Sequence, residues 1–339
     1  MEKKSGSMFM AGLLTGLLGA CLLGALVIKP KAVSGAAADR VVLKLGHGLD
    51  EQHPVHKGML HLKQRLEELT GGKATIDVYP AGVLGNEKES LEQVQMGEMG
   101  MTKVSTAALE AFLPAMKVFG IPFVFRDEGH FWKTLNGPVG ERMLELGVPN
   151  RFRGLCYYDS GDRNFYSTKK PIRSVVDVAG MKIRVMSSST AMDMIAMMKG
   201  SACPTSWGEL YTALAQGTVD AAENNWPSFV TSRHFEVCKY FSCSGHQRIP
   251  DMLIVSTQKW DELSPGIQKA LRQAAKESEE YQRKLWREET ERCIAFAKEK
   301  GVEIIEPDVE SFRAACATFP MQKDYQGLKK LYDEIQEVK

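Results

Sequence analysis

Short apolar runs alternate with longer stretches of helical spacing from residue 41 onward. Residues 41–46 and 74–79 are predicted strands, while apolar side chains recur every three or four positions over residues 54–69. A second helix is predicted over residues 87–96, with Asn86 as its N-cap, because a side-chain oxygen there can accept a backbone N–H of the first turn. Strands that alternate with helices predict an α/β fold with a parallel sheet, and such sheets bind ligands at the carboxyl ends of their strands.

The second half of the chain repeats this alternation around Arg184. In the predicted strand 181–185, Lys182 and Arg184 share one face and the apolar side chains the other. Nothing nearby in the sequence pairs with Arg184. Its charge therefore indicates a side chain that extends from a strand edge to solvent, an ion pair with a structural carboxylate, or a binding site for an anion.

Three further segments indicate how the chain is organised. Residues 153–158 form a predicted strand that leads to Gly161, a candidate hinge, and residues 251–255 form a strand that returns to the first half. A long charged helix is predicted over residues 264–300, with serine as its cap and proline at its first position. A final helix is predicted over residues 325–338.

The N-terminus predicts export. Two lysines precede an uncharged apolar run over residues 8–28, which is longer than the core of an ordinary signal peptide and approaches the length of a membrane span. Residues 1–38 are therefore a predicted signal peptide or membrane anchor, with cleavage after alanines 36–38, lipid attachment at Cys21 and retention as an anchor as the three alternatives. Lipid attachment is the least favoured, because an apolar stretch follows Cys21. All three place the rest of the chain in the periplasm, in agreement with the positive-inside rule.

Length and charge are those of an ordinary globular protein. A chain of 339 residues with 44% hydrophobic residues allows two domains, each with its own core. The formal net charge is +1, and because residues 1–38 carry four lysines and one glutamate, the remainder carries −2. No basic patch indicates a nucleic-acid partner.

Cysteine spacing and short motifs predict neither a metal site nor catalysis. Apart from Cys21 there are six cysteines, none at a spacing typical of zinc sites. Cys238 with Cys243, or Cys293 with Cys316, could form disulfides in an oxidising compartment and would otherwise stay thiols. No phosphate loop, nucleophile elbow or dinucleotide-binding motif is present, so no cofactor and no enzyme activity are predicted.

Two weaker chemical alternatives remain. An enzyme would need a base near a nucleophile, and His47 and Glu209 could be imagined as such, but Glu209 lies on a predicted helix, where a structural bond between elements is the commoner role. Four methionines, at positions 192, 194, 197 and 198, cluster on the predicted helix that begins at Ser189. Methionine at helical spacing is typical of a core rather than of a soft-metal site.

A more specific signal comes from motifs spaced along the chain in a fixed order. They are Tyr79–Gly85, Gly120–Phe125, Gly161–Tyr166, Asp177–Val185 and Trp207–Ser228. In this order they resemble the solute-binding proteins of tripartite ATP-independent periplasmic (TRAP) transporters, the family named for dicarboxylate binding, and the resemblance covers nearly all of the chain after residue 39.

The resemblance implies a fold and a division of the chain. The expected fold is α/β, with two lobes as in periplasmic binding proteins, a cleft between the lobes and a long helix that spans both. Lobe I is expected to comprise residues 39–160 and 250–289. Lobe II is expected to comprise residues 161–249 and 290–339.

The resemblance also implies roles for five side chains. Arg184 would hold the ligand carboxylate through two parallel hydrogen bonds, a geometry that suits the planar guanidinium. Arg163 would contact the carboxylate or a hydroxyl, and Asn224 and Asn225 can both donate to and accept from sugar oxygens. Trp207 would pack against the apolar face of a sugar ring, or else belong to the core.

Position relative to the predicted strands adds four candidate ligand contacts. They are His47, Glu87, Ser105 and His246. The first three follow strands of the first lobe and the fourth lies at the return crossing, although a cap, a turn or a solvated side chain is equally compatible with the sequence. His53 and His56, on or near the first helix, are predicted to lie on the surface.

The motif Asn224–Ser228 most resembles the members that bind hexuronates. The predicted function is therefore capture of a hexuronate, such as D-glucuronate or D-galacturonate, and its delivery to a TRAP permease. The alternatives are another sugar acid, a dicarboxylate or a keto acid in the same fold, a ligand sensor for a histidine kinase, or a periplasmic enzyme.

Overall fold

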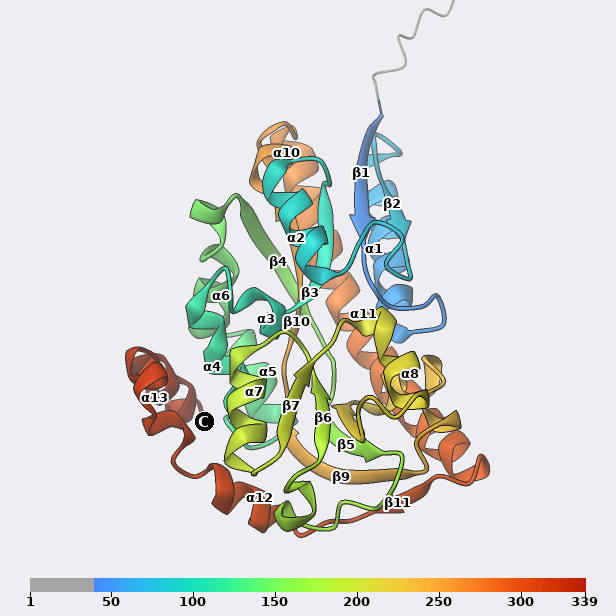
Figure 1. Cartoon of the computed structure of the whole chain (residues 1–339). Helices are drawn as coiled ribbons and strands as arrows, with labels where there is room; N and C mark the ends of the chain where they lie inside the picture. Colours follow the sequence, from blue (N-terminus) through green and yellow to red (C-terminus); the bar gives the residue numbers. More distant parts are fainter. Residues whose placement is uncertain (1–39) are drawn as a thin grey trace, which may run out of the picture. The chain divides into compact units, whose positions relative to one another are not determined.

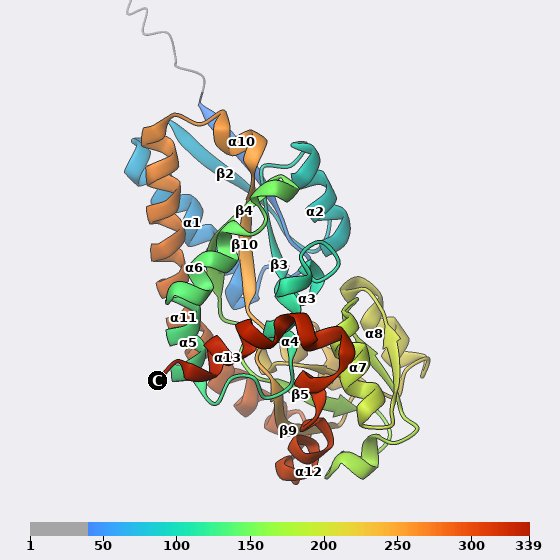
Figure 2. The ribbon, with the colours of Figure 1, turned by 90° about the vertical axis from the view of Figure 1, so that its left-hand side faces the viewer.

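The computed structural model describes residues 40–339. The predictions for the export segment, including the apolar run 8–28 and Cys21, lie outside the described residues. Within residues 40–339 no helix is long and apolar enough to cross a membrane. Figures 1 and 2 show this part of the chain from two directions.

The first sheet has five strands in the order β2-β1-β3-β10-β4. They are β1 (Val41–Gly46), β2 (Ala74–Tyr79), β3 (Met101–Ser105), β4 (Phe152–Tyr158) and β10 (Asp251–Ser256). The three N-terminal strands are parallel, whereas β10 is antiparallel to β3 and to β4. The prediction of a purely parallel sheet is therefore wrong, because the chain re-enters this sheet from the other lobe and begins β10 at the edge where β3 ends.

Within residues 40–339, seven helices accompany this first sheet, and together they are called the first half below. They are α1 (Pro54–Thr70), α2 (Glu87–Met96), α3 (Thr106–Leu109), α4 (Lys117–Gly120), α5 (Glu128–Leu135), α6 (Pro138–Glu145) and α10 (Thr257–Asp261). The predicted N-cap of α2 is confirmed, since the Asn86 side chain accepts from the backbone of Glu89 while the Glu89 carboxylate accepts from the backbone of Asn86. This reciprocal cap fixes where α2 starts, and hence where Glu87 lies.

The second sheet has six strands in the order β11-β9-β5-β8-β6-β7. They are β5 (Arg163–Ser167), β6 (Lys182–Val185), β7 (Ser201–Pro204), β8 (Ala221–Asn224), β9 (Tyr240–Gln247) and β11 (Glu303–Ile305). Its helices are α7 (Ser189–Met197), α8 (Trp207–Ala215), α9 (Trp226–Thr231) and α12 (Val309–Cys316). Arg184 on β6 lies opposite Ala222 of β8 and Cys203 of β7, so it is in the middle of a ladder rather than at an edge.

One helix connects the two halves. Helix α11 (Pro265–Glu299) starts at the predicted cap, Ser264, and packs against α1 and β4 of the first half and α9 of the second. Lys57 Nζ of α1 lies 2.9 Å from Glu289 Oε1 of α11. The expected two-lobe fold with a long shared helix is therefore confirmed (Figure 1).

The C-terminal segment differs from its prediction. Residues Lys323–Leu328 form a 3₁₀ turn, and only Lys329–Glu337 form a helix, α13. Gly327 lies inside the predicted helix, and glycine costs about 1 kcal/mol there relative to alanine. Helix α13 packs against α6, with His130 Nε2 2.8 Å from the carbonyl oxygen of Ile335, whereas α12 packs against β9. The assignment of all residues 290–339 to lobe II stays a prediction.

The methionines of α7 lie in the hydrophobic core, as predicted. Met194 and Met198 are buried, and Met192 and Met197 pack against the same cluster. All six cysteines of the described chain are unbonded, and four of them are buried. Within residues 40–339 no three histidine, cysteine or acidic side chains are arranged to hold a metal ion.

Candidate functional site

Side chains from both halves line a cavity of about 400 Å³. The first half contributes His53, Glu87, Lys103, Ser105 and Asp251. The second half contributes Arg163, Arg184, Trp207, Asn224 and Asn225. Seven of the nine predicted contacts therefore meet at one cavity, and this cavity lies where the chain crosses between the two sheets.

Arg184 is buried without a carboxylate partner. Its side chain is 2% exposed, and its Nε donates to the carbonyl oxygen of Thr205 at 2.9 Å. Within residues 40–339 no carboxylate lies in ion-pair range of the guanidinium, and Nη1 has no hydrogen-bond acceptor. Burial lowers the pKa of Arg184 from its ordinary value, because a charge without a partner is costly away from water. An arginine so placed has free donors for an anion.

Arg163 has the opposite surroundings. Its Nη2 donates to Glu223 Oε1 at 2.8 Å, its Nε donates to the other oxygen of the same carboxylate, and its Nη1 donates to Asn224 Oδ1 at 3.2 Å. Burial alone would lower the pKa of Arg163, but the Glu223 carboxylate outweighs it and raises that pKa. Burial opposes ionisation of Glu223 as well, yet Arg163 and His246 lower the Glu223 pKa to about 2. Arg163 therefore carries a charge that the protein has already neutralised.

The two asparagines keep their amide N–H groups free of protein acceptors. Asn224 Oδ1 accepts from Arg163 and from the backbone N–H of Asn225, while Asn225 Oδ1 accepts from the backbone N–H of Ser228 and caps α9. No acceptor in residues 40–339 lies in hydrogen-bond range of either amide nitrogen. Since both residues line the cavity, their amide groups offer donors to a bound oxygen.

Trp207 lies beside the free arginine. It is the first residue of α8 and lines the cavity, and its ring centroid is 5.6 Å from Arg184 Cζ. Such a distance is that of a cation–π contact, which helps to hold the guanidinium in place. Other atoms of Trp207 pack against two hydrophobic clusters, while the residue also lines the cavity. Its packing against a sugar ring stays a prediction.

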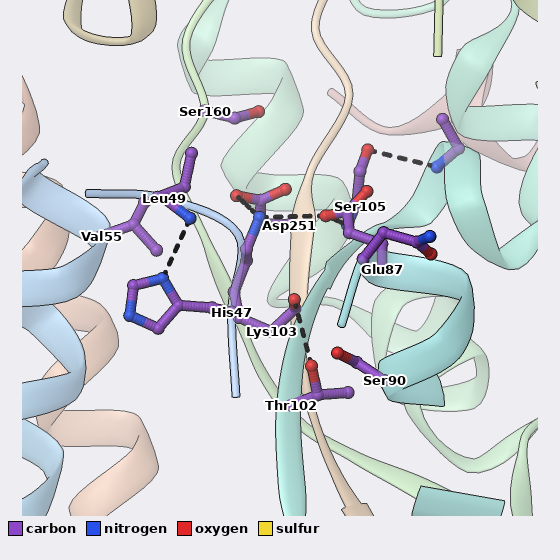
Figure 3. A network of polar contacts seen from close by, with 12 residues as sticks. His47, Leu49, Val55, Glu87, Ser90, Thr102, Lys103, Ser105, Ser160 and Asp251 are labelled. Atoms are coloured by element: carbon purple, nitrogen blue, oxygen red, sulfur yellow. Dashed lines mark hydrogen bonds and ion pairs between the residues drawn. The ribbon is translucent and has the colours of Figure 1, made fainter. Parts of the chain in front are cut away.

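The first-lobe wall is built around a buried lysine. Lys103 Nζ lies 3.1 Å from Glu87 Oε1 and 3.2 Å from Asp251 Oδ2 (Figure 3). Burial would lower the pKa of Lys103, but the two carboxylates outweigh it and raise that pKa, so the ammonium stays charged. Glu87 Oε1 also accepts from the backbone N–H of Ser105 at 3.0 Å. This network joins β3, α2 and β10 at the edge of the sheet that faces the cavity.

Sequence reasoning did not identify Lys103 or Asp251, although a signal was present. Both occur in short apolar runs that become buried strands, and lysine and aspartate are seldom buried unless they are paired. A lysine inside β3 and an aspartate at the start of β10 could therefore have been matched as partners at the cleft.

The prediction that His53 lies on the surface is wrong. The residue is 1% exposed, lines the cavity and caps α1. Its Nδ1 accepts from the backbone N–H of Val55 at 3.2 Å, so its Nε2 donates to Ser228 Oγ at 3.1 Å, across to the second half. His56 is also buried, at 6% exposed. The prediction failed because the N-terminus of α1 points into the cleft instead of toward solvent.

His47 and His246 lie behind the cavity wall rather than on it. A hydrogen bond of 3.0 Å joins His47 Nε2 and His56 Nδ1. Burial, together with the nearby Lys103 charge, lowers the pKa of His47 to about 2. His246 stacks on Phe165 and lies 3.8 Å from Glu223 Oε2. Neither residue reaches the cavity, so the two predicted contacts support their neighbours instead. Glu209 is exposed on α8.

Two α/β lobes share a long helix, and a cavity lies at their crossing with an arginine that has no carboxylate partner within residues 40–339. This arrangement is that of an extracytoplasmic solute-binding protein. The chain belongs to the bacterial extracellular solute-binding protein family 7, also called DctP, whose family model matches residues 45–325. It is therefore a solute-binding protein of the TRAP type, as its motifs indicated. Members of this family bind small acids and work with membrane permease subunits.

Solved structures of TRAP periplasmic solute-binding proteins share this fold. The protein from Xanthobacter autotrophicus Py2, with bound β-D-galacturonate, is 34% identical with a TM-score of 0.84, over 88% of this chain and 100% of that one. The protein from Anaerococcus prevotii, with bound D-glucuronate, is 33% identical with a TM-score of 0.85, over 88% and 98%. A third, from Polaromonas, is bound to D-erythronate and is 32% identical with a TM-score of 0.85, over 88% and 99%.

Proposed function

We propose that this protein captures a hexuronate, D-glucuronate or D-galacturonate, in the cavity between its lobes and delivers it to a TRAP permease. One observation carries the proposal: Arg184 is buried in the cavity wall with no carboxylate partner among residues 40–339. A ligand carboxylate would form an ion pair with Arg184 through two charge-assisted hydrogen bonds. Exclusion of water from the cavity strengthens that ion pair, because the local dielectric constant falls.

The remaining wall suits the hydroxyl groups of a sugar acid. The amide groups of Asn224 and Asn225 donate, while the carboxylates of Glu87 and Asp251 accept. Arg163, already paired with Glu223, acts as a rigid donor at the carboxylate end rather than as a second counter-ion. Proteins of 33–34% identity were solved with hexuronates bound, which supports this assignment.

A smaller sugar acid in the same cavity is the second candidate. A protein of 32% identity with the same fold is bound to D-erythronate, which has a carboxylate and hydroxyls but a shorter chain. The same Arg184 clamp would serve both ligands, so the length of the ligand rather than its charge separates the two candidates.

Ligand capture closes the lobes, and the closed form is the one that a permease recognises. Two contacts join the lobes in this structure: His53 with Ser228 at 3.1 Å, and the Glu110 carboxylate with the start of α7, where it accepts from the Ser188 hydroxyl at 2.9 Å. A ligand that touches both walls favours the state that makes these contacts. In this scheme the protein acts in the periplasm and leaves its ligand chemically unchanged.

Thermal unfolding of the purified protein tests the proposal. The panel comprises D-glucuronate, D-galacturonate, D-erythronate, a C4-dicarboxylate, a keto acid and, as the neutral control, D-glucose. A ligand at about 100–1,000 times its Kd adds about 2.7–4.1 kcal/mol, which raises Tm by several degrees. We expect a shift with the hexuronates and none with glucose.

Each other outcome has a distinct meaning. A shift only with erythronate or other small acids would retain the carboxylate clamp and overturn the hexuronate. A shift with glucose as large as that with glucuronate would overturn the clamp. Absence of a shift with every acid would remove the solute-capture proposal and favour a sensor role. Recovery of unchanged ligand from the complex checks that no turnover occurs.

A further inference from the structure

The cavity is electrically polarised. Arg184 provides an unbalanced positive charge on the second-lobe wall. On the first-lobe wall, Lys103 is shared by Glu87 and Asp251, so this wall has a formal charge of −1. Arg163 adds no net charge because Glu223 neutralises it.

One further cation borders the cavity without changing this balance. Lys88 follows Glu87 on α2, and its side chain is 73% exposed. Water and salt screen a charge so placed, and such a charge contributes little to a site in the interior. The polarity of the cavity is therefore set by the buried groups.

The free atoms of the negative wall are acceptors. Glu87 Oε1 already receives the Lys103 ammonium and the Ser105 backbone N–H, which leaves Oε2 without a donor from residues 40–339. Asp251 uses Oδ2 for Lys103, and its other oxygen has no donor in the same part of the chain. Figure 3 shows both carboxylates beside Lys103, with Ser105 and Ser160 nearby. Burial raises the pKa of Asp251, and Lys103 opposes this by favouring the ionised form. In the ionised form a carboxylate only accepts hydrogen bonds, so these two oxygens then require donors from the ligand.

We propose that the Lys103–Glu87–Asp251 wall selects ligands with a single carboxylate, because it accepts hydrogen bonds from hydroxyl groups and repels a second acid group. This inference rests on the proposed function, in which the first carboxylate binds Arg184. The ligand class is then a polyhydroxy monocarboxylate, and the diacid of the same carbon skeleton is excluded. A hydroxyl donates to Glu87 Oε2, whereas a carboxylate there has no proton to donate and adds like charge at close range.

The electrostatic surroundings of the two walls support this division. Burial lowers the pKa of Arg184, and Glu87 is the weakest of several groups that oppose this. Burial also acts to lower the pKa of Arg163, which Glu223 chiefly raises, with a smaller contribution from Asp251. The acidic wall is thus close enough to influence charges at the opposite end of the cavity. A second carboxylate that reaches the first-lobe wall would be repelled by this acidic charge.

Lys103 is a positioning residue in this arrangement. It is 5% exposed, lines the cavity with Glu87 and Asp251, and lies in ion-pair range of one oxygen of each carboxylate, which leaves the other oxygen of each free. Without its positive charge, the two carboxylates would repel each other, and one of them would take up a proton.

Calorimetric Kd values for matched acids test the inference. The pairs are D-glucuronate with D-glucarate, and D-erythronate with meso-tartrate, in which the second member carries an additional carboxylate at the other end. We expect the wild-type protein to prefer the monoacid of whichever pair it binds by roughly 100-fold, since like-charge contact costs several kcal/mol. Glu87→Gln should narrow that preference by about tenfold, because it removes one charge and supplies an amide donor.

Glu92→Gln is the matched control. It removes the same charge from the same helix, α2, at a side chain that is 46% exposed and does not line the cavity. The control should keep the wild-type preference. Asp251→Asn is the second test variant, and a thermal melt of each variant verifies that it is folded.

The outcomes separate this inference from the proposed function. Equal binding of monoacid and diacid by the wild type would overturn the inference alone, since Arg184 would still hold a carboxylate. A preference that survives unchanged in both Glu87→Gln and Asp251→Asn would also overturn it. If the wild type bound no acid of either pair, the proposed function would fail first, and the inference with it.

Discussion

The two buried arginines of the second lobe show how differently a folded protein can treat the same side chain. Arg163 and Arg184 both line the cavity, on strands separated by β8, and are 4% and 2% exposed. Glu223 forms an ion pair with Arg163 and raises the Arg163 pKa, whereas burial without a partner lowers the pKa of Arg184. The comparison teaches that charge alone does not mark a binding residue. The informative feature is a buried charge whose partner is missing from the described chain.

The largest expected effect on folding comes from breaking the completed pair. Arg163→Ala would leave Glu223 buried and uncompensated, so we expect the free energy of unfolding to fall by about 3–5 kcal/mol. Urea denaturation of the ligand-free protein measures it. The double variant Arg163→Met/Glu223→Leu should recover much of the loss, because neither charge remains. A single variant as stable as the wild type would show that the pair is not structural.

The unpaired arginine should show the reverse pattern. Arg184→Ala is expected to weaken sugar-acid binding by about 2–5 kcal/mol, since it removes the counter-ion of a buried carboxylate. Ligand-free stability should be unchanged or increased, because the variant removes an unpaired buried charge. Calorimetry and urea denaturation give the two values.

Arg184→Lys provides the control for geometry. Lysine keeps the charge but cannot form two parallel bonds, so its binding should lie between those of the wild type and Arg184→Ala. Undiminished binding by Arg184→Ala would contradict the assigned role.

The pH dependence of stability tests whether Arg163 holds Glu223 in its ionised form. Its folded pKa of about 2 lies below the ordinary 4.5, so ionisation of this group stabilises the fold fully above about pH 4.5, and the stabilisation is lost as the pH falls through about 2. The difference is worth about 3 kcal/mol at most. We expect the stability gap between wild type and Glu223→Gln to narrow between pH 5 and pH 3 in urea denaturation. A gap that stays constant over this range would mean that Glu223 is not held ionised by Arg163.

The smallest effect should come from the aromatic neighbour of the free arginine. Trp207→Leu removes the ring 5.6 Å from Arg184 Cζ and should weaken binding by about 0.5–1 kcal/mol. Trp207→Phe, which keeps a ring, should fall between this variant and the wild type in calorimetry. A loss as large as that of Arg184→Ala would instead indicate that Trp207 contacts the ligand directly.

Local features were predictable from the sequence because their causes are local. The caps Asn86 and Ser264 and the helical spacing that follows each one predict where α2 and α11 begin. The alternation 182–185 likewise predicts β6. Such signals depend on neighbours within a few positions, so they survive in any tertiary context.

Long-range features were not predictable in the same way. Nothing near β10 in the sequence indicates that it will run antiparallel between β3 and β4, since that direction follows from the second crossing. His53 lines the cavity and His47 does not, for a similar reason: the orientation of α1 decides which histidine faces the cleft. Glu223, the partner of Arg163, is 60 positions away in the sequence. The motif resemblance located the arginines, but only the fold distinguishes the paired one from the free one.

The long helix α11 gives the protein a mechanical property. Its 35 residues contain no proline after the first position and no glycine after the second, so the residues that most often kink a helix are absent from its interior. It is nevertheless packed against both lobes. Any rotation of one lobe relative to the other must therefore bend this helix gently along its length or slide a lobe along it. The resistance of α11 to bending therefore opposes a wide opening of the cavity.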